Sequence, residues 1–83
     1  MPLISQQEAR QMGIPKKTLQ TILISRKHTL AESKQWLKDN NYANSYYRTT
    51  ANFRRFMQTP PIKGAKYYST VLPNGVELVH QEY

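Results

Sequence analysis

The sequence predicts a small α+β domain, in which one amphipathic helix packs on a mostly antiparallel sheet. Three observations predict it: two helix-capping motifs, a β-branched segment between them, and a Pro-Asn-Gly turn near the end of the chain. The expected order is a short N-terminal helix followed by β-α-β-β-β, with the helices on one face of the sheet. At 83 residues the chain is expected to be a single domain, with 1–17 as a helical arm and 18–83 as the core.

The first predicted helix runs from Gln6 to Met12. Ser5 and Glu8 have the spacing of a capping box, in which each side chain satisfies a free backbone N–H at the other's position. Gly13 suits the left-handed residue that follows a helix end, and Pro15 prevents the helix from continuing.

The second predicted helix runs from Leu30 to about Asn40. It opens with another capping box, formed by Thr29 and Glu32. Trp36 is interpreted as a core anchor, because it lies on the apolar stripe expected to pack on the sheet. That stripe consists of Leu30, Ser33, Trp36, Leu37 and Asn40.

Residues 18–26 have two interpretations. The β-branched Thr21, Ile22 and Ile24 favour a strand, and apolar residues of both parities are typical of a central strand covered on both faces. The alternative is a helix-turn-helix through residues 6–26, because small, turn and apolar residues fall at suitable spacings. Those residues are Ala9, Met12, Gly13, Ile14, Leu19 and Ile22.

The segment from Tyr46 to Thr59 is predicted to be one strand, rich in aromatic residues and arginine, which Pro60 and Pro61 end. Because side chains alternate along a strand, neighbouring residues are expected on opposite faces. One face would carry Phe53, Arg55 and Met57, and the other Arg54, Phe56 and Gln58.

The end of the chain predicts a hairpin. The segment 72–76, Leu-Pro-Asn-Gly-Val, fits a type I turn with proline at its second position and glycine in a left-handed bulge. This turn fixes the register of the flanking strands. In that register the opposite charges of Lys66 and Glu82 face each other. The expected pairs are Leu72 with Val76, Thr70 with Leu78, Tyr68 with His80 and Lys66 with Glu82.

The composition argues against catalysis. The chain has no cysteine, which excludes disulfides, thiol chemistry and cysteine-based metal sites. His28 and His80 are far apart, with no metal-ligand spacing, and the three glycines are not clustered as in a phosphate-binding loop. We therefore expect a protein that is not an enzyme and that uses no cofactor and no metal.

No segment of the sequence suggests a membrane or an export signal. The longest apolar stretch, Ile22–Ile24, is far shorter than the ~20 residues that cross a bilayer. The first residues lack the charged and apolar regions of a signal peptide. We expect a soluble protein with no membrane partner that is not secreted and acts inside a host cell (cytoplasm or nucleus) or in a virion.

Charge indicates the class of partner. Twelve Lys and Arg against five Asp and Glu give a formal net charge of +7, which attracts phosphate polymers. Arginine and lysine alternate with aromatics in the predicted strands, a pattern that can pair phosphates and stack bases. The predicted nucleic-acid-binding residues are Arg26, Lys27, Arg48, Arg54, Arg55, Lys66 and Tyr67.

Residues 19–83 resemble a short uncharacterised domain of bacteriophage and large DNA virus proteins. The resemblance rests on the Trp36-Leu37 helix, the Arg55-Phe56-x-Gln58 strand and the Asn74-Gly75-Val76 hairpin. It implies a viral or mobile-element origin and a β-α-β-β-β core, and it implies no activity. The chain departs from the pattern at Ser33, where alanine is usual, and at Met57, where a second arginine is common.

The leading functional hypothesis is a small, non-enzymatic nucleic-acid-binding accessory protein, with DNA and RNA not distinguished. The first alternative is a protein-binding module for virion assembly or a host factor. It would use the basic surface against an acidic partner, or a C-terminal edge strand, and could form a homo-oligomer. The second alternative is a helix-turn-helix DNA binder through residues 6–26.

Overall fold

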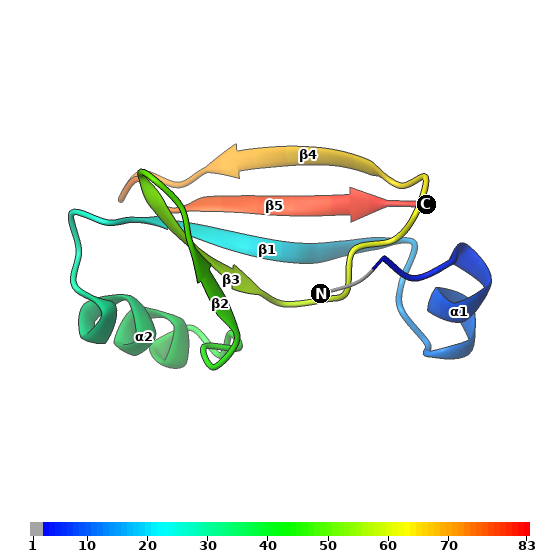
Figure 1. The fold of residues 1–83 in the computed structure, drawn as a ribbon, viewed down its shortest axis with the longest axis horizontal. Coiled ribbons are helices and arrows are strands. Elements are labelled where there is room, and N and C mark those ends of the chain that lie inside the picture. The colour runs from blue at the N-terminus through cyan, green and yellow to red at the C-terminus, as the bar shows by residue number, and fades with distance from the viewer. Residues whose placement is uncertain (1–2) are drawn as a thin grey trace.

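The structure is a computed structural model that describes residues 3–83. A short helix precedes a strand and the main helix, and four more strands follow (Figure 1). This arrangement confirms the α+β prediction. The elements are α1 (Gln6–Gln11), β1 (Lys17–Ser25), α2 (Leu30–Asp39), β2 (Tyr47–Thr49), β3 (Phe53–Met57), β4 (Lys66–Val71) and β5 (Glu77–Glu82).

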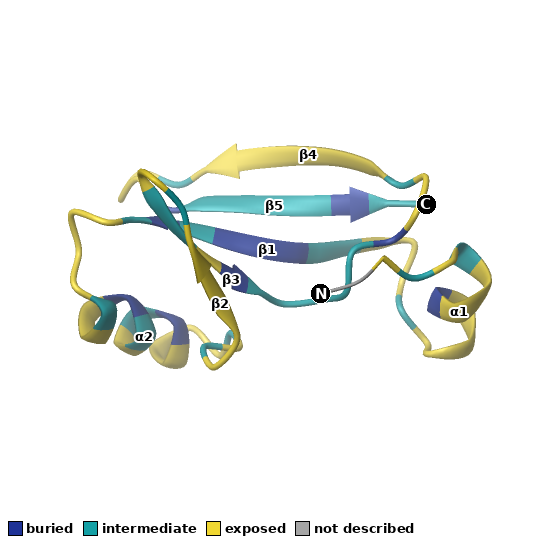
Figure 2. Ribbon diagram, in the orientation of Figure 1, coloured by how far each residue is buried: buried dark blue, intermediate teal, exposed yellow. Residues whose placement is uncertain are grey.

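The five strands form one sheet in the order β2-β3-β1-β5-β4, and every neighbouring pair is antiparallel. The β-branched strand β1 lies at the centre, as the strand interpretation of this segment expected. Thr21, Ile22 and Ile24 are all buried there, whereas β4 is exposed along its length at one edge (Figure 2). The helix-turn-helix alternative is wrong, because residues 17–25 are this central strand.

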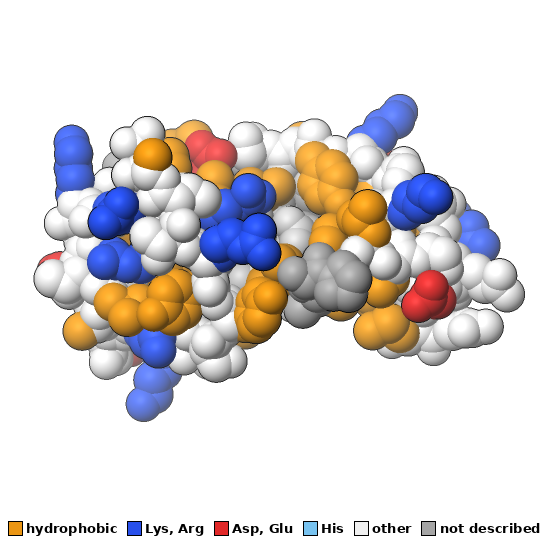
Figure 3. Space-filling model, in the orientation of Figure 1, with side chains coloured by type: hydrophobic (Ala, Val, Ile, Leu, Met, Phe, Trp, Pro, Cys, Tyr) orange, Lys and Arg blue, Asp and Glu red, His pale blue; other side chains and the backbone are white. Residues whose placement is uncertain are grey.

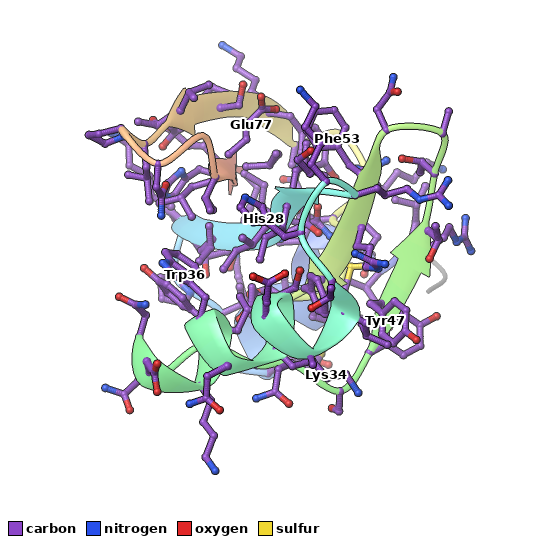
Figure 4. The ribbon with its side chains drawn as sticks, turned by 90° about the vertical axis from the view of Figure 1, so that its left-hand side faces the viewer. His28, Lys34, Trp36, Tyr47, Phe53 and Glu77 are labelled. Atoms are coloured by element: carbon purple, nitrogen blue, oxygen red, sulfur yellow. The ribbon has the colours of Figure 1, made fainter. Side chains whose placement is uncertain are left out.

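Helix α2 covers one face of the sheet, and the hydrophobic core lies between them. Figure 4 shows Trp36 and Lys34 of α2 on the same side of the sheet as Tyr47, with Phe53 on the other side. The buried core consists of Ile22, Ile24, Leu37, Phe56 and Val76, with Leu19, Leu30, Trp36, Tyr42, Leu72 and Leu78 packed against it.

Both predicted capping boxes are present. The Ser5 hydroxyl accepts a hydrogen bond from the Glu8 N–H at 3.0 Å, and the Glu8 carboxylate accepts one from the Ser5 N–H at 3.3 Å. In α2 the Thr29 hydroxyl accepts from the Glu32 N–H at 3.1 Å, and Glu32 accepts from the Thr29 N–H at 2.8 Å. Each helix ends one residue earlier than predicted, at Gln11 and at Asp39 respectively.

The C-terminal hairpin has the predicted turn and register. The Gly75 N–H donates to the Leu72 carbonyl at 2.9 Å, and Gly75 has a φ of +86°, which suits glycine because it has no Cβ. The strand partners are Lys66 with Glu82, Tyr68 with His80 and Thr70 with Leu78, as expected.

Two predictions about the strands are wrong. The predicted strand from Tyr46 to Thr59 is a hairpin of two strands, whose turn lies at 50–52 and is held by the Thr50 N–H donating to the Phe53 carbonyl at 2.8 Å. Neither glycine nor proline marks this turn in the sequence. The C-terminal strand is also not an edge strand, because β5 lies between β1 and β4; the edge belongs to β4.

Helix α1 and the 60–65 segment lie together at the end of the sheet away from α2 (Figure 1). Ile4 and Ile62 form a parallel bridge, which links the N-terminal arm to this segment. Gln81 is fully buried beneath it: its amide donates to the Pro60 carbonyl at 2.9 Å and accepts from the Ile62 N–H at 3.1 Å. Within residues 3–83, no helix is long and apolar enough to cross a membrane.

Candidate functional site

The sheet face opposite α2 carries a groove. The register aligns Thr21 of β1 with Met57 of β3 on one side and Val79 of β5 on the other, so these three side chains share this face. No helix covers them, since α2 packs on the alternate residues Ile22 and Phe56. The groove has a volume of about 400 Å³, and residues from all five strands line it.

The lining combines an apolar floor with cationic and aromatic walls. Arg48 and Arg55 come from β2 and β3, Tyr67 comes from β4, and Tyr46 directly precedes β2. In the view of Figure 3, which has the orientation of Figure 1, Lys and Arg side chains gather over β2 and β3, next to hydrophobic side chains over β4 and β5. The described lining residues include no carboxylate: they are Gln20, Thr21, Tyr46, Arg48, Arg55, Met57, Pro61, Tyr67 and Val79.

Arg48 and Arg55 lie directly opposite each other in neighbouring strands. Like charges in this position repel and destabilise a sheet, typically by a few tenths of a kcal/mol. Both side chains are exposed. Within residues 3–83, neither guanidinium makes an ion pair or a hydrogen bond: the single salt bridge joins Lys17 and Glu82, at 3.9 Å. The pair therefore has its full hydrogen-bonding capacity free for a ligand.

Two other predicted site residues bind the protein's own backbone. Arg54 lies on the α2 side of β3, where its guanidinium donates to the His28 carbonyl at 2.7 Å. Arg26 donates to the carbonyls of Thr50 and Ala51, both at 3.3 Å, and so fixes the β2–β3 turn. These two arginines have structural roles and do not line the groove.

Lys27 and Lys66 lie away from the groove. Lys27 is exposed in the turn between β1 and α2. Lys66 is exposed at the start of β4, on the opposite face from Tyr67, and it pairs in register with Glu82. Of the seven predicted site residues, the structure therefore brings three together in the groove, namely Arg48, Arg55 and Tyr67.

The N-terminus of α2, next to the basic segment 26–28, is occupied by a carboxylate of the protein itself, that of Glu32. Hydrogen bonds from the Thr29 backbone and hydroxyl hold the pKa of the Glu32 carboxyl below its usual value of 4.5. This carboxylate occupies the position where a bound phosphate would meet the helix N-terminus. The segment 26–28 is thus less suited to bind phosphate than the groove.

Sequence reasoning missed the floor of the groove and one of its walls. Met57 was placed on the same face as Arg55, but it was not recognised as part of a site. Tyr46 lies at the start of the predicted aromatic, arginine-rich segment but was not among the predicted site residues, although half of its surface is exposed. Thr21 and Val79 come from distant parts of the chain, and only the pairing of β1 with β5 brings them together.

A second, smaller cavity of about 270 Å³ lies between α2 and the β4–β5 turn. Ile24, Trp36 and Val76 give it an apolar lining, and His28 and Glu32 lie at its polar side. Its described lining residues include no arginine or lysine, so it lacks the charge that distinguishes the groove. In the part of the chain that the structure describes, no group of three or more His, Asp or Glu side chains could hold a metal ion.

Comparison with protein-family models, with curated proteins and with solved structures finds no match to this chain. The resemblance to the viral domain therefore stays a prediction.

Proposed function

We propose that this protein binds nucleic acid, without catalysing a reaction, through the groove on the open face of its sheet. One observation carries the proposal. Arg48 and Arg55 face each other across β2 and β3 with no ion pair or hydrogen bond among the described residues. A bound phosphate between them would replace a repulsion with two charge-assisted contacts.

The whole-molecule charge supports the same class of ligand. A formal net charge of +7 on 83 residues raises the encounter rate with polyanions. Arginine suits phosphate because its planar guanidinium donates two parallel hydrogen bonds. Tyr46 and Tyr67, which are exposed and also line the groove, add stacking surfaces.

The test compares two double variants that each remove two positive charges. Arg48→Gln/Arg55→Gln changes the groove, and Lys16→Gln/Lys38→Gln changes exposed lysines that do not line it. Binding to fluorescein-labelled single-stranded and hairpin-duplex DNA and RNA is followed by anisotropy at several salt concentrations. Unlabelled polyglutamate serves as a protein-like polyanion competitor.

Loss of the arginine pair should weaken binding at least about tenfold, since hydrogen bonds to charged groups contribute about 1.5–3 kcal/mol each. It should also reduce the slope of log affinity against log salt for each lost phosphate contact, by about 0.7 with the single-stranded probes and about 0.9 with duplex DNA. The lysine control should keep affinity within about threefold, because distant exposed charges are screened. Equal losses of affinity in the two double variants would show that the groove is not the binding site. If polyglutamate competed as strongly as unlabelled nucleic acid, an acidic protein partner would be indicated instead.

The exposed edge of β4 favours protein binding as a second candidate function. All six residues of β4 are exposed. The alternating hydrogen bonds of the hairpin begin with Leu72 donating to Val76, so the N–H groups of Tyr67, Ser69 and Val71 are expected to point away from β5. Such an edge can accept a strand from another protein or a second copy.

Ser69→Pro tests this second candidate, because proline removes the outward N–H without a loss in the β4–β5 ladder. Affinity capture should then lose partners that wild-type protein retains, while nucleic-acid binding stays unchanged. Identical captured proteins for both forms would argue against strand addition.

A further inference from the structure

We propose that the ligand is single-stranded nucleic acid, and that an unpaired base enters the groove and stacks on Tyr67 while Arg48 and Arg55 hold the adjoining phosphate. This inference rests on the proposed function and adds the state of the nucleic acid and the way the base is bound. The shape of the groove favours a single strand. Proteins that read a duplex insert a helix or a protruding β-ribbon into its grooves, whereas this surface is a recess that a ligand group must enter.

The size and lining of the recess suit a nucleobase. Its volume of about 400 Å³ lies in the range of sites that hold small organic ligands, typically about 300–1,000 Å³. Met57 and Val79 provide an apolar floor against which a flat ring can lose its hydration. In a duplex the bases are stacked and paired, so only a single strand presents such a ring without an unpairing cost.

Tyr67 is the aromatic residue best placed to stack on that base. It projects from β4 into the groove lining, and 48% of its surface is exposed. Its hydroxyl donates a long hydrogen bond to the Ile62 carbonyl, at 3.4 Å, which restrains the ring toward the 60–65 segment. A ring that is already restrained in this way loses less conformational freedom when a base stacks on it.

The arginine pair and Tyr67 lie on opposite sides of the groove. In strand order, β2 and β3 carry the arginines, Met57 of β3, Thr21 of β1 and Val79 of β5 form the floor, and β4 carries the tyrosine. A strand that crosses the sheet can therefore place its backbone at one wall and its base toward the other. Sheets that bind RNA in this way stack about two or three bases, which sets the expected size of the site.

The test uses three labelled probes: an oligothymidine of about 12 nucleotides, an abasic oligomer of equal phosphate number, and a hairpin duplex of equal phosphate number. Wild-type protein should bind the oligothymidine at least about tenfold more tightly than either control, since stacking contributes about 1–3 kcal/mol per base. Equal affinity for all three probes would overturn this inference and leave the proposed function standing. No binding to any of them would overturn both.

Variants of Tyr67 locate the stacking. Tyr67→Val should weaken oligothymidine binding about five- to 150-fold and leave binding of the abasic oligomer unchanged. Tyr67→Phe should stay within about threefold of wild type, because it keeps the ring and loses only the long hydrogen bond to Ile62. Circular dichroism and thermal unfolding of both variants show whether they fold. A well-folded Tyr67→Val protein with wild-type oligothymidine affinity would contradict the role of Tyr67.

Discussion

The two faces of the sheet use the same residue types in different ways. On the face that α2 covers, Phe56 is fully buried and Arg54 donates to the His28 carbonyl. On the open face, Phe53 is half-buried and Arg55 makes no hydrogen bond or ion pair within residues 3–83. The two phenylalanines and the two arginines all belong to one five-residue strand, β3. They lie on different faces only because side chains alternate along a strand.

This difference shows how stability and binding can be divided within a small domain. A chain of 83 residues has one modest core, and here that core lies between α2 and one face of the sheet. The other face holds Arg48 and Arg55, which make no ion pair or hydrogen bond within residues 3–83, and the exposed Tyr46 and Tyr67. Substitutions of core residues on the covered face should therefore change stability, and substitutions of these exposed residues on the open face should change binding.

The two phenylalanines of β3 give the largest expected contrast. Phe56→Ala should lower the free energy of unfolding by about 3–5 kcal/mol, because it leaves a cavity in the core. Phe53→Ala should cost at most about half of that, since its ring is already partly in contact with water. Urea unfolding of the two variants measures both values. Similar losses would mean that the open face contributes as much to folding as the covered face.

The two arginines of β3 should show opposite effects on stability and binding. Arg54→Met should cost about 1.5–3 kcal/mol of stability, the typical contribution of a charge-assisted hydrogen bond, and should leave nucleic-acid affinity within about threefold. Arg55→Met should keep or slightly raise stability, because it relieves the repulsion from Arg48. It should also weaken nucleic-acid binding by about tenfold. Chemical unfolding and anisotropy on the same preparations test the contrast, and a loss of binding in Arg54→Met alone would reverse the assignment of the faces.

Removing the N-cap side chain of α2 should have a smaller effect, which is limited to stability. Thr29→Ala should lower the free energy of unfolding by about 1 kcal/mol, the usual loss for an N-cap side chain. Binding to the groove should not change, because α2 lies on the other side of the sheet. Thermal unfolding and anisotropy measure the two effects, and an altered affinity would show that the faces are coupled.

The smallest expected effect is the dependence on pH of the stability that Glu32 contributes to the same capping box. The pKa of Glu32 is lowered when the protein is folded, so its stabilisation is fully present above the ordinary value of 4.5 and disappears as the pH falls through the lower folded value. Wild-type protein should therefore lose stability below this pH more steeply than Glu32→Gln, whose amide does not titrate. The free energy of unfolding of both proteins is measured from neutral pH to pH values below 4.5. The same dependence on pH in the two proteins would contradict this role of Glu32.

Local features could be predicted from the sequence because they depend on residues a few positions apart. The capping boxes join Ser5 to Glu8 and Thr29 to Glu32, and the Pro-Asn-Gly turn sets the register of its own hairpin. The β2–β3 turn was missed because residues 50–52, Thr-Ala-Asn, include neither glycine nor proline. The edge was misassigned because strand order depends on long-range pairing, which brings β5 beside β1 and leaves β4 outside.

The sequence by itself determined which residues could share a face, since side chains alternate along a strand: it separated Arg54 from Arg55 and Phe53 from Phe56. It also determined the net charge and the start of each helix. Only the tertiary structure decided which face α2 covers, and therefore which arginine binds the backbone and which remains free for a ligand. The groove likewise exists only in the folded chain, because its floor joins Thr21, Met57 and Val79 from three separate strands.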